Sequence, residues 1–300
     1  MEAILLRHLS RPLLTLRAVI VAVAISISVT AIAASPVPDD SLPPIRPVTS
    51  AYMVEAGSAH LADTYLSPLK YSGWHMGLAY DRRQAMRFDP ARWVMQLRGD
   101  IGVSRTLNPA RNATMWDLML HLSWGMSRRW HLPHSITLYA GGSTSLDAGC
   151  LYSARNGNNP ASAKGAWTVN ATAAIAWHTR LWRVPLTLCY QPTLPVTGIF
   201  FAPDYGELYY EIYLGDRSGL VHGAWWGNYF KLDNLLTADL RLGATTLRIG
   251  YRCDILSTHV EHTTTRIVTH SAVLGVVSEW LSLHPGRRPD PTARIISASY

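Results

Sequence analysis

The sequence predicts an all-β protein, an antiparallel transmembrane β-barrel of about 12 strands preceded by a cleaved signal peptide. Three observations support this prediction. The first 35 residues have the layout of an export signal. Later segments alternate apolar and polar residues, as strands do. The longest apolar faces carry a tryptophan at each end, which is typical of strands that cross a membrane.

The alternation is clearest in two segments. In residues 116–126, which read WDLMLHLSWGM, every second side chain is large and apolar, and most of the others are polar or small. In residues 167–177, Trp167 and Trp177 lie at the two ends of the apolar face. Ten residues at roughly 3.3 Å each, tilted by about 40°, rise about 25 Å, the height of the apolar band of an outer-membrane barrel. Both segments are therefore predicted to have one lipid-facing side and one lumen-facing side.

The N-terminus resembles a secretory signal. Arg7, Arg11 and Arg17 precede an apolar run over residues 18–34 that closes on small residues. A single membrane-anchoring helix is the alternative, because about seventeen apolar residues lie at the lower edge of spanning length. Polar residues within the run and the prolines after it favour cleavage. We expect a signal peptide over 1–33 and a proline-rich periplasmic segment over 34–50.

The barrel itself is predicted over 51–281, followed by a tail over 282–300. Clusters of turn residues separate the candidate strands. The candidate strands are 51–61, 72–83, 92–105, 114–129, 135–146, 165–179, 184–197, 207–214, 236–242, 245–255 and 263–280, with one more within 220–230. An even number places both chain ends on the periplasmic side. Because the tail continues past the last strand, either it tucks back or the assembly signal is not terminal.

A soluble β-sandwich would show the same strand spacing, but its strands would bury apolar residues in a core. Here the face opposite the apolar one is polar, which favours a barrel lumen. The candidate lumen cluster is Arg98, Asp100, Asp117, His121, Glu211, Asp239, Arg241, Arg248 and Asp254. Charges of both signs are mixed within it, so we expect them to plug a narrow lumen rather than line a selective pore.

Aromatic residues are dense between residues 203 and 230. The candidate plug or ligand-binding aromatics are Tyr205, Tyr209, Tyr213, Trp225 and Tyr229. Aromatic rings flanked by Gly, Asn and Asp suit stacking on sugars or packing inside a barrel mouth. We expect part of this segment to fold into the mouth or lumen.

No catalytic, cofactor-binding or metal-binding residue is predicted. His259, His262 and His270 fit an exposed cluster better than a metal site, because residues three apart on a strand point to opposite faces. Asp117 and His121 are about 13 Å apart along a strand, too far for a hydrogen bond. His270 with Ser271 is the other pair considered for a lipid-modifying enzyme. Three cysteines are too few for a disulfide framework.

The net charge of +7 would suggest nucleic acid in a cytosolic protein. Several arginines lie in the signal peptide and in the tail, however, and export removes most nucleic-acid partners from reach. The expected partners are outer-membrane lipid, the barrel-assembly machinery during biogenesis, and either a small solute or a glycan. No nucleic-acid partner and no cofactor are expected.

Two segments resemble a known family. Residues 62–86 read ADTYLSPLKYSGWHMGLAYDRRQAM, and residues 196–228 read VTGIFFAPDYGELYYEIYLGDRSGLVHGAWWGN. Both are similar to the domain of unknown function 3316 family of exported Bacteroidetes proteins, as are Asp239 and residues 246–251. The resemblance implies a signal peptide, an outer-membrane-type barrel in a Gram-negative bacterium, and no established activity.

The sequence thus predicts an outer-membrane barrel with a structural, ligand-binding or small-solute transport role and a largely plugged lumen. Two alternatives from other classes remain: a lipid-modifying barrel enzyme and a secreted soluble β-sandwich that binds a ligand.

Overall fold

The computed structural model describes residues 44–157, 159–203, 215, 219–243, 245–280 and 295–298. The predicted signal peptide and residues 34–43 of the predicted periplasmic segment lie outside the described residues. All described residues belong to one compact unit, residues 44–300. Among them, no helix is long and apolar enough to cross a membrane.

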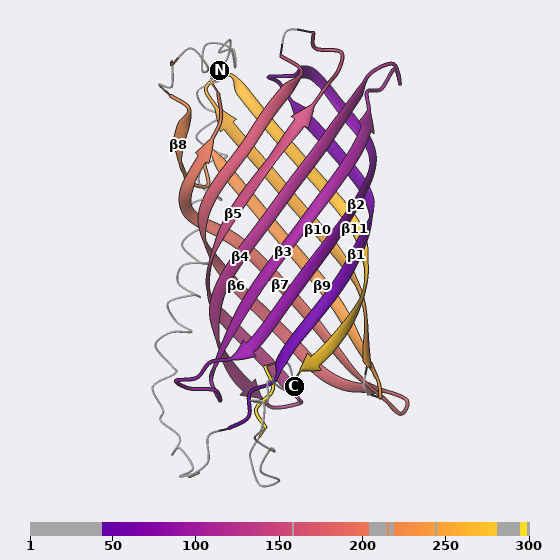
Figure 1. Ribbon diagram of the computed structural model, residues 1–300, viewed down its shortest axis with the longest axis vertical. Helices are drawn as coiled ribbons and strands as arrows, with labels where there is room; N and C mark the ends of the chain where they lie inside the picture. The colour runs from indigo at the N-terminus through magenta and orange to yellow at the C-terminus, as the bar shows by residue number, and fades with distance from the viewer. Residues whose placement is uncertain are drawn as a thin grey trace, which may run out of the picture. The chain divides into compact units, whose positions relative to one another are not determined.

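Antiparallel strands make up nearly all of the described chain (Figure 1). They are β1 (Val48–Asp63), β2 (Ser67–Ala85), β3 (Trp93–Leu107), β4 (Thr114–Leu132), β5 (Ile136–Tyr152), β6 (Ala161–Leu181), β7 (Val184–Phe201), β8 (Val221–Ala224), β9 (Tyr229–Leu242), β10 (Thr245–Val260) and β11 (Thr263–Trp280). Consecutive strands pair from β1 to β7 and from β9 to β11, β7 pairs with β9, and β1 pairs with β11. These pairings close the sheet into a barrel.

The ring contains ten strand positions, so the prediction of about 12 strands was wrong. Both β8 and β9 pair with β7, one after the other: β8 with residues 198–201 and β9 with residues 186–193. A short turn separates them, in which the Trp225 carbonyl accepts hydrogen bonds from the backbone N–H groups of Asn228 and Tyr229. The two strands therefore share one position in the ring. The strand predicted at 207–214 lies outside the described residues.

The register fixes how steeply the strands run. The row of paired residues that starts at Ile175 of β6 passes through β7, β9 and the following strands and returns to β6 at Ala163, 12 residues away. With standard strand spacings, this offset over ten strands corresponds to a tilt of roughly 40°. A ten-stranded ring is narrow, so its inward side chains occupy most of the lumen.

The two faces of the wall are inverted relative to a soluble barrel. On β4, the Leu118, Leu120 and Leu122 side chains are about half exposed on the outside, whereas Asp117 is 2% exposed on the inside. The same alternation runs along β6, where Thr168 and Asn170 are buried between exposed apolar neighbours. An apolar exterior around a polar interior is the arrangement of a transmembrane β-barrel.

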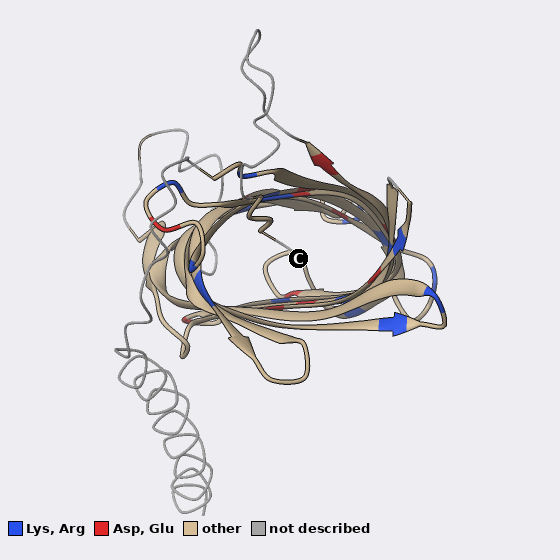
Figure 2. Ribbon diagram, turned by 90° about the horizontal axis from the view of Figure 1, so that it is seen from below, with Lys and Arg blue, Asp and Glu red and all other residues tan. Residues whose placement is uncertain are grey.

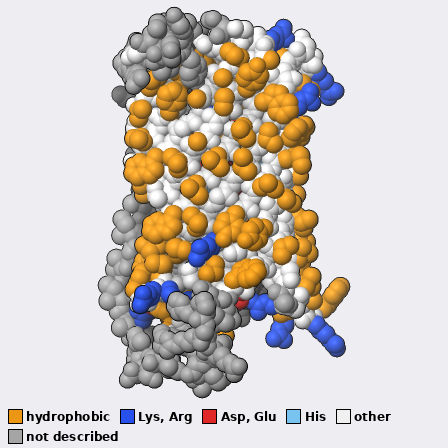
Figure 3. All heavy atoms as spheres, viewed as in Figure 1, with side chains coloured by type: hydrophobic (Ala, Val, Ile, Leu, Met, Phe, Trp, Pro, Cys, Tyr) orange, Lys and Arg blue, Asp and Glu red, His pale blue; other side chains and the backbone are white. Residues whose placement is uncertain are grey.

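Aromatic residues border the apolar wall at both ends (Figure 3). We call the end where β1 begins and β11 finishes the near end, and the opposite end the far end. The outward tryptophans near the near end are Trp93, Trp130, Trp177 and Trp280, and those toward the far end are Trp74, Trp116 and Trp167. Arg105 and Arg128 lie over the Trp116 and Trp130 rings at 5.8 and 5.4 Å. Cations therefore lie at the level where lipid headgroups begin.

Candidate functional site

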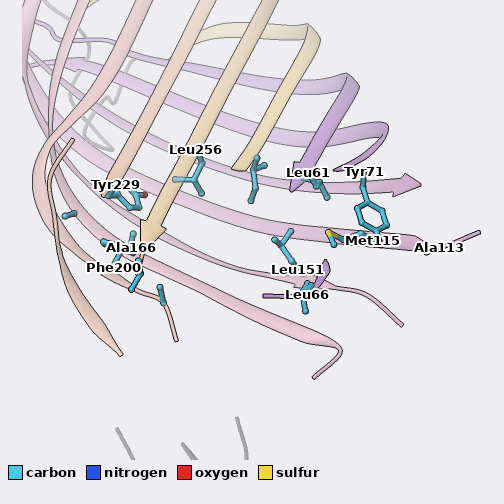
Figure 4. Close-up of a cluster of buried hydrophobic side chains, with 14 residues drawn as sticks. Leu61, Leu66, Tyr71, Ala113, Met115, Leu151, Ala166, Phe200, Tyr229 and Leu256 are labelled. Carbon is cyan, nitrogen blue, oxygen red and sulfur yellow. The ribbon is translucent and has the colours of Figure 1, made fainter. Parts of the chain in front are cut away.

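The lumen is the candidate site, because it gathers nearly all of the buried polar side chains, and it is filled in three layers. At the far end, side chains from many strands and from the β1–β2 turn pack into an apolar cluster (Figure 4). We call it the far cluster; its buried members are Leu61, Leu66, Tyr71, Ala113, Met115, Leu151, Ala166, Phe200, Ala202, Ala224, Tyr229, Leu256, Val260 and Ile267. The Phe200 and Tyr229 ring centroids are 5.2 Å apart. This cluster closes the far end of the lumen with apolar contacts.

The middle layer is held by Arg252 of β10. Its guanidinium donates to both carboxylate oxygens of Asp233 at 2.9 and 3.2 Å, and to Glu55 and Asp100 at 3.2 Å each. These three carboxylates come from β9, β1 and β3. Arg252 is 5% exposed, so the pairs lie away from bulk water. A planar guanidinium with several N–H donors is suited to joining several carboxylates at once.

Three contacts join strands that are five positions apart in the ring of ten, and therefore on opposite walls. Near the far end, Lys164 of β6 pairs with Asp63 of β1 at 2.8 Å. In the middle, Arg98 of β3 pairs with Asp233 of β9 at 3.0 Å. Toward the near end, Arg83 of β2 donates to Gln191 of β7 at 2.6 Å. Figure 2 shows a ring flattened in cross-section, which brings opposite walls within reach of these side chains.

Further ion pairs extend the middle layer in both directions. Asp147 accepts hydrogen bonds from Lys231 and His121, both at 2.6 Å. Arg248 donates to both carboxylate oxygens of Asp239 at 2.7 Å. Charged groups can lie in this interior because most of them are matched by an opposite charge or a hydrogen-bonding partner.

Two buried carboxylates are less well matched. Asp117 accepts one hydrogen bond from Ser104 at 3.1 Å, and Ser104 also contacts His75 Nδ1 at 3.0 Å. The other Asp117 oxygen and one oxygen of Asp254 have no hydrogen-bond partner among the described residues. The hydroxyl lies between the acid and the imidazole, so His75 is not positioned between Ser104 and Asp117 as the base of a nucleophilic triad would be.

A part of the C-terminal tail closes the near end. Arg129 Nη1 donates to the Ser297 carbonyl at 2.6 Å, and the Tyr139 hydroxyl donates to the Ala298 carbonyl at 3.3 Å. Ala298 is fully buried in a cluster with Val94, Tyr139, Ala174, Ala176 and Cys189. Beside it, Ile45 and Ile295 form a parallel bridge. Residues 295–298 therefore tuck back into the barrel. This is the first of the two outcomes that the sequence left open for the tail.

Two small cavities lie between the middle layer and the near end, with volumes of ≈ 30 and ≈ 10 Å³. Gln96, Ser127, Thr172 and Gln191 line both. A cavity needs on the order of 10–15 Å³ to hold one water molecule, so these volumes suit a few waters and no larger solute.

The structure places eight of the nine predicted lumen residues on the inward side of the wall. They are Arg98, Asp100, Asp117, His121, Asp239, Arg241, Arg248 and Asp254; Glu211 lies outside the described residues. Within this set, Arg98 pairs with Asp100 at 3.7 Å, and His121 pairs with Asp147 from outside the set. Asp117 and His121 do not contact each other, because Asp117 bonds Ser104 instead.

The predicted aromatic group is divided. Tyr205, Tyr209 and Tyr213 lie outside the described residues. Trp225 is 59% exposed, whereas Tyr229 is 3% exposed within the far cluster. The described segment β8 extends the wall beside β7.

Sequence reasoning missed several residues of the middle layer, namely Glu55, Asp81, Asp147, Lys231, Asp233 and Arg252. Each lies on the same parity as buried neighbours of its strand, so extending the alternation along every strand was the signal that could have found them.

The histidines form no metal site among the described residues, where no group of three or more His, Cys, Asp or Glu side chains is placed to hold an ion. His270 points outward and contacts the Tyr251 hydroxyl at 2.6 Å, while Ser271 is buried on the lumen side. The pair considered for catalysis is therefore split between the two faces.

Several solved outer-membrane proteins share weak similarity with the chain. The translocator domain of the autotransporter NalP from Neisseria meningitidis has a TM-score of 0.40 and 10% identity, over 81% of this chain and 90% of that one. The transport unit of the autotransporter AIDA-I from Escherichia coli has a TM-score of 0.39 and 8% identity, over 83% and 94%. An outer membrane channel from Pseudomonas putida F1 has a TM-score of 0.36 and 9% identity, over 82% and 100%. With scores this low, the assignment of the fold rests on the strand pairing itself.

A comparison with curated protein sequences finds no match. Residues 14–287 match the family described as "Protein of unknown function (DUF3316)". The match spans the whole described barrel and includes both segments that carry the resemblance, so the chain belongs to this family.

Proposed function

We propose that this protein is a closed outer-membrane barrel that acts as a structural, membrane-embedded scaffold, and that it neither conducts solutes nor catalyses a reaction. The single observation that carries the proposal is the set of contacts across the lumen. Lys164–Asp63, Arg98–Asp233 and Arg83–Gln191 each join opposite walls at a different height.

The two ends of the lumen support the same proposal. The far cluster fills one end, and residues 295–298 occupy the other. An open pore needs a continuous water-filled path, and solute transport needs room for the solute. Cavities of ≈ 30 and ≈ 10 Å³ provide neither.

The outer wall supports placement in an outer membrane. Its apolar side chains face outward between two aromatic borders, and the backbone hydrogen bonds are closed around the ring. A barrel of this kind satisfies its backbone polar groups inside hydrocarbon. The partner of this wall is membrane lipid.

Planar-bilayer recording tests the proposal. The intact protein, refolded and inserted, should be nearly silent, while a wide porin recorded in the same bilayers shows that the assay detects open channels. Large, stable conductance from the intact protein would reject the closed lumen and favour solute transport.

A further inference from the structure

Charge is divided between the two faces of the barrel wall. In the described strands, every Asp and Glu lies on the lumen-facing parity. The outward parity carries cations instead, namely Lys70, Arg82, Arg105, Arg128 and Arg266. Figure 3 shows Lys and Arg gathered near the two ends of the visible wall. The outer surface can therefore attract anions at both rims, while the carboxylates are kept on the lumen side.

Two of these cations form a pair at the far rim. Lys70 of β2 and Arg266 of β11 both lie opposite Ala62 of β1 in the strand register. Their Cα atoms are thus two strand spacings apart, roughly 9–10 Å. Both side chains are exposed, and no described residue forms an ion pair with either. The small Ala62 side chain leaves space between two long cationic side chains that can converge on one phosphate.

Hydrogen-bonding groups lie just below this pair, toward the middle of the wall. His60 is the next outward residue of β1, and its Nδ1 contacts Ser72 Oγ at 3.0 Å. That contact holds the ring and leaves Nε2 available to a ligand. The Trp74 ring follows on β2 and packs against Trp116 with ring centroids 6.2 Å apart. This level matches the boundary between headgroups and acyl chains.

An apolar groove of ≈ 730 Å³ lies farther along the same strands, from mid-height toward the near end of the wall. Its lining includes Tyr52, Val54, Leu78, Ile101, Leu274 and Val276. Between Val54 and His60, the outward positions of β1 are Ala56 and Ser58. A path bordered by small side chains therefore connects the cation pair to the groove.

We propose that the outer wall over β11, β1 and β2 is a binding site for one anionic membrane lipid. Its phosphate lies between Lys70 and Arg266, and an acyl chain follows β1 past Ala56 toward the groove. The two ends of the site thus match the two parts of such a lipid in charge and polarity. This inference rests on the proposed function only in requiring a membrane-inserted barrel.

Native mass spectrometry of the full, detergent-purified protein tests the site, with long-chain phosphatidylglycerol and phosphatidylcholine as probes. We expect one tightly held phosphatidylglycerol and much weaker retention of phosphatidylcholine. The double variant Lys70→Gln/Arg266→Gln should bind phosphatidylglycerol about 30-fold more weakly. The matched control Arg82→Gln/Arg128→Gln removes two outward cations near the other rim and should keep the tight site.

Ala56 allows the acyl end of the site to be tested separately. It lies on the outward side of β1 between the cation pair and the groove, and it is exposed. Ala56→Phe should therefore fold and block the path, weakening long-chain phosphatidylglycerol several-fold more than a short-chain form.

Unchanged phosphatidylglycerol binding in the double variant, or equal retention of the two headgroups by the parent, would reject the site. Each variant is also checked by its unheated mobility on a gel, and the single variants Lys70→Gln and Arg266→Gln replace the double variant if its folded band is lost. Loss of the lipid site with a silent, folded barrel leaves the closed-barrel proposal intact. A conducting parent protein that still holds the lipid would reject the closed barrel and leave the lipid site intact.

Discussion

The inner and outer faces of one strand obey opposite rules in this barrel. Leu120 and His121 are neighbours on β4, yet Leu120 is 52% exposed on the lipid side and His121 contacts Asp147 inside. On the outside, apolar side chains are stable because lipid surrounds them. On the inside, charges are stable because opposite charges neutralise them. The effect of a substitution should therefore depend on the parity of the position more than on the residue that it replaces.

The largest effect is expected from removing the cation at the centre of the lumen. Arg252→Leu leaves Glu55, Asp100 and Asp233 without their shared partner. Breaking a buried ion pair from one side costs about 3–5 kcal/mol. Denaturant unfolding of the refolded barrel should show a loss of that size. Arg82→Leu, which removes an outward arginine, should change the unfolding free energy by less than about 1 kcal/mol. Similar losses in the two variants would contradict the division between the faces.

The next largest effect comes from placing a charge on the outer face. Leu120→Arg and Ala173→Arg should each destabilise the inserted barrel by about 2–4 kcal/mol, the cost of a cation near the bilayer midplane. Ser123→Arg and Thr172→Arg place the same side chain on the inner face, beside the ≈ 30 Å³ cavity. These inner variants should be better tolerated. Folded yield in lipid vesicles measures the difference, and equal damage on both faces would indicate a packed core on each side.

The sequence predicts the wall of this barrel better than its contents. The alternation at 116–126 and 167–177 correctly assigns each side chain of β4 and β6 to a face, because the period of a strand is fixed by its geometry. The strand count was wrong at residues 220–230, where a four-residue turn divides one strand position between β8 and β9. The local sequence pattern predicts β8 and β9 as separate strands, but it does not show that both pair with β7.

The contacts across the lumen could not be predicted in the same way. Parity places Arg98 and Asp233 inside, but their pairing depends on the ring size and on the register of every intervening strand. The tail has no alternation, so nothing in its sequence points to Arg129 or Tyr139 as its partners. The candidate lumen cluster was therefore found as a set of inward residues, without its internal connections.

A smaller loss of stability than in these lumen and outer-face variants is expected from removing the tail. This deletion also extends the comparison of the two faces to the cysteines. Cys189 faces the lumen beside Ala298, whereas Cys150 and Cys253 lie on the outward parity. Deleting residues 281–300 removes the hydrogen bonds from Arg129 and Tyr139, which together contribute about 2 kcal/mol. The barrel should remain folded and its near end should open to water.

Labelling with a charged, membrane-impermeant maleimide measures this opening. In a Cys150→Ser/Cys253→Ser background, Cys189 should react slowly in the intact chain and at least about tenfold faster after the deletion, because a thiol reacts only where the reagent can reach it. A chain that keeps Cys253 as its single cysteine is the control. That side chain faces lipid, so the deletion should not change its rate. Equal Cys189 rates with and without the tail would show that residues 295–298 do not shield the lumen, leaving the contacts across the middle layer as the barrier at the near end.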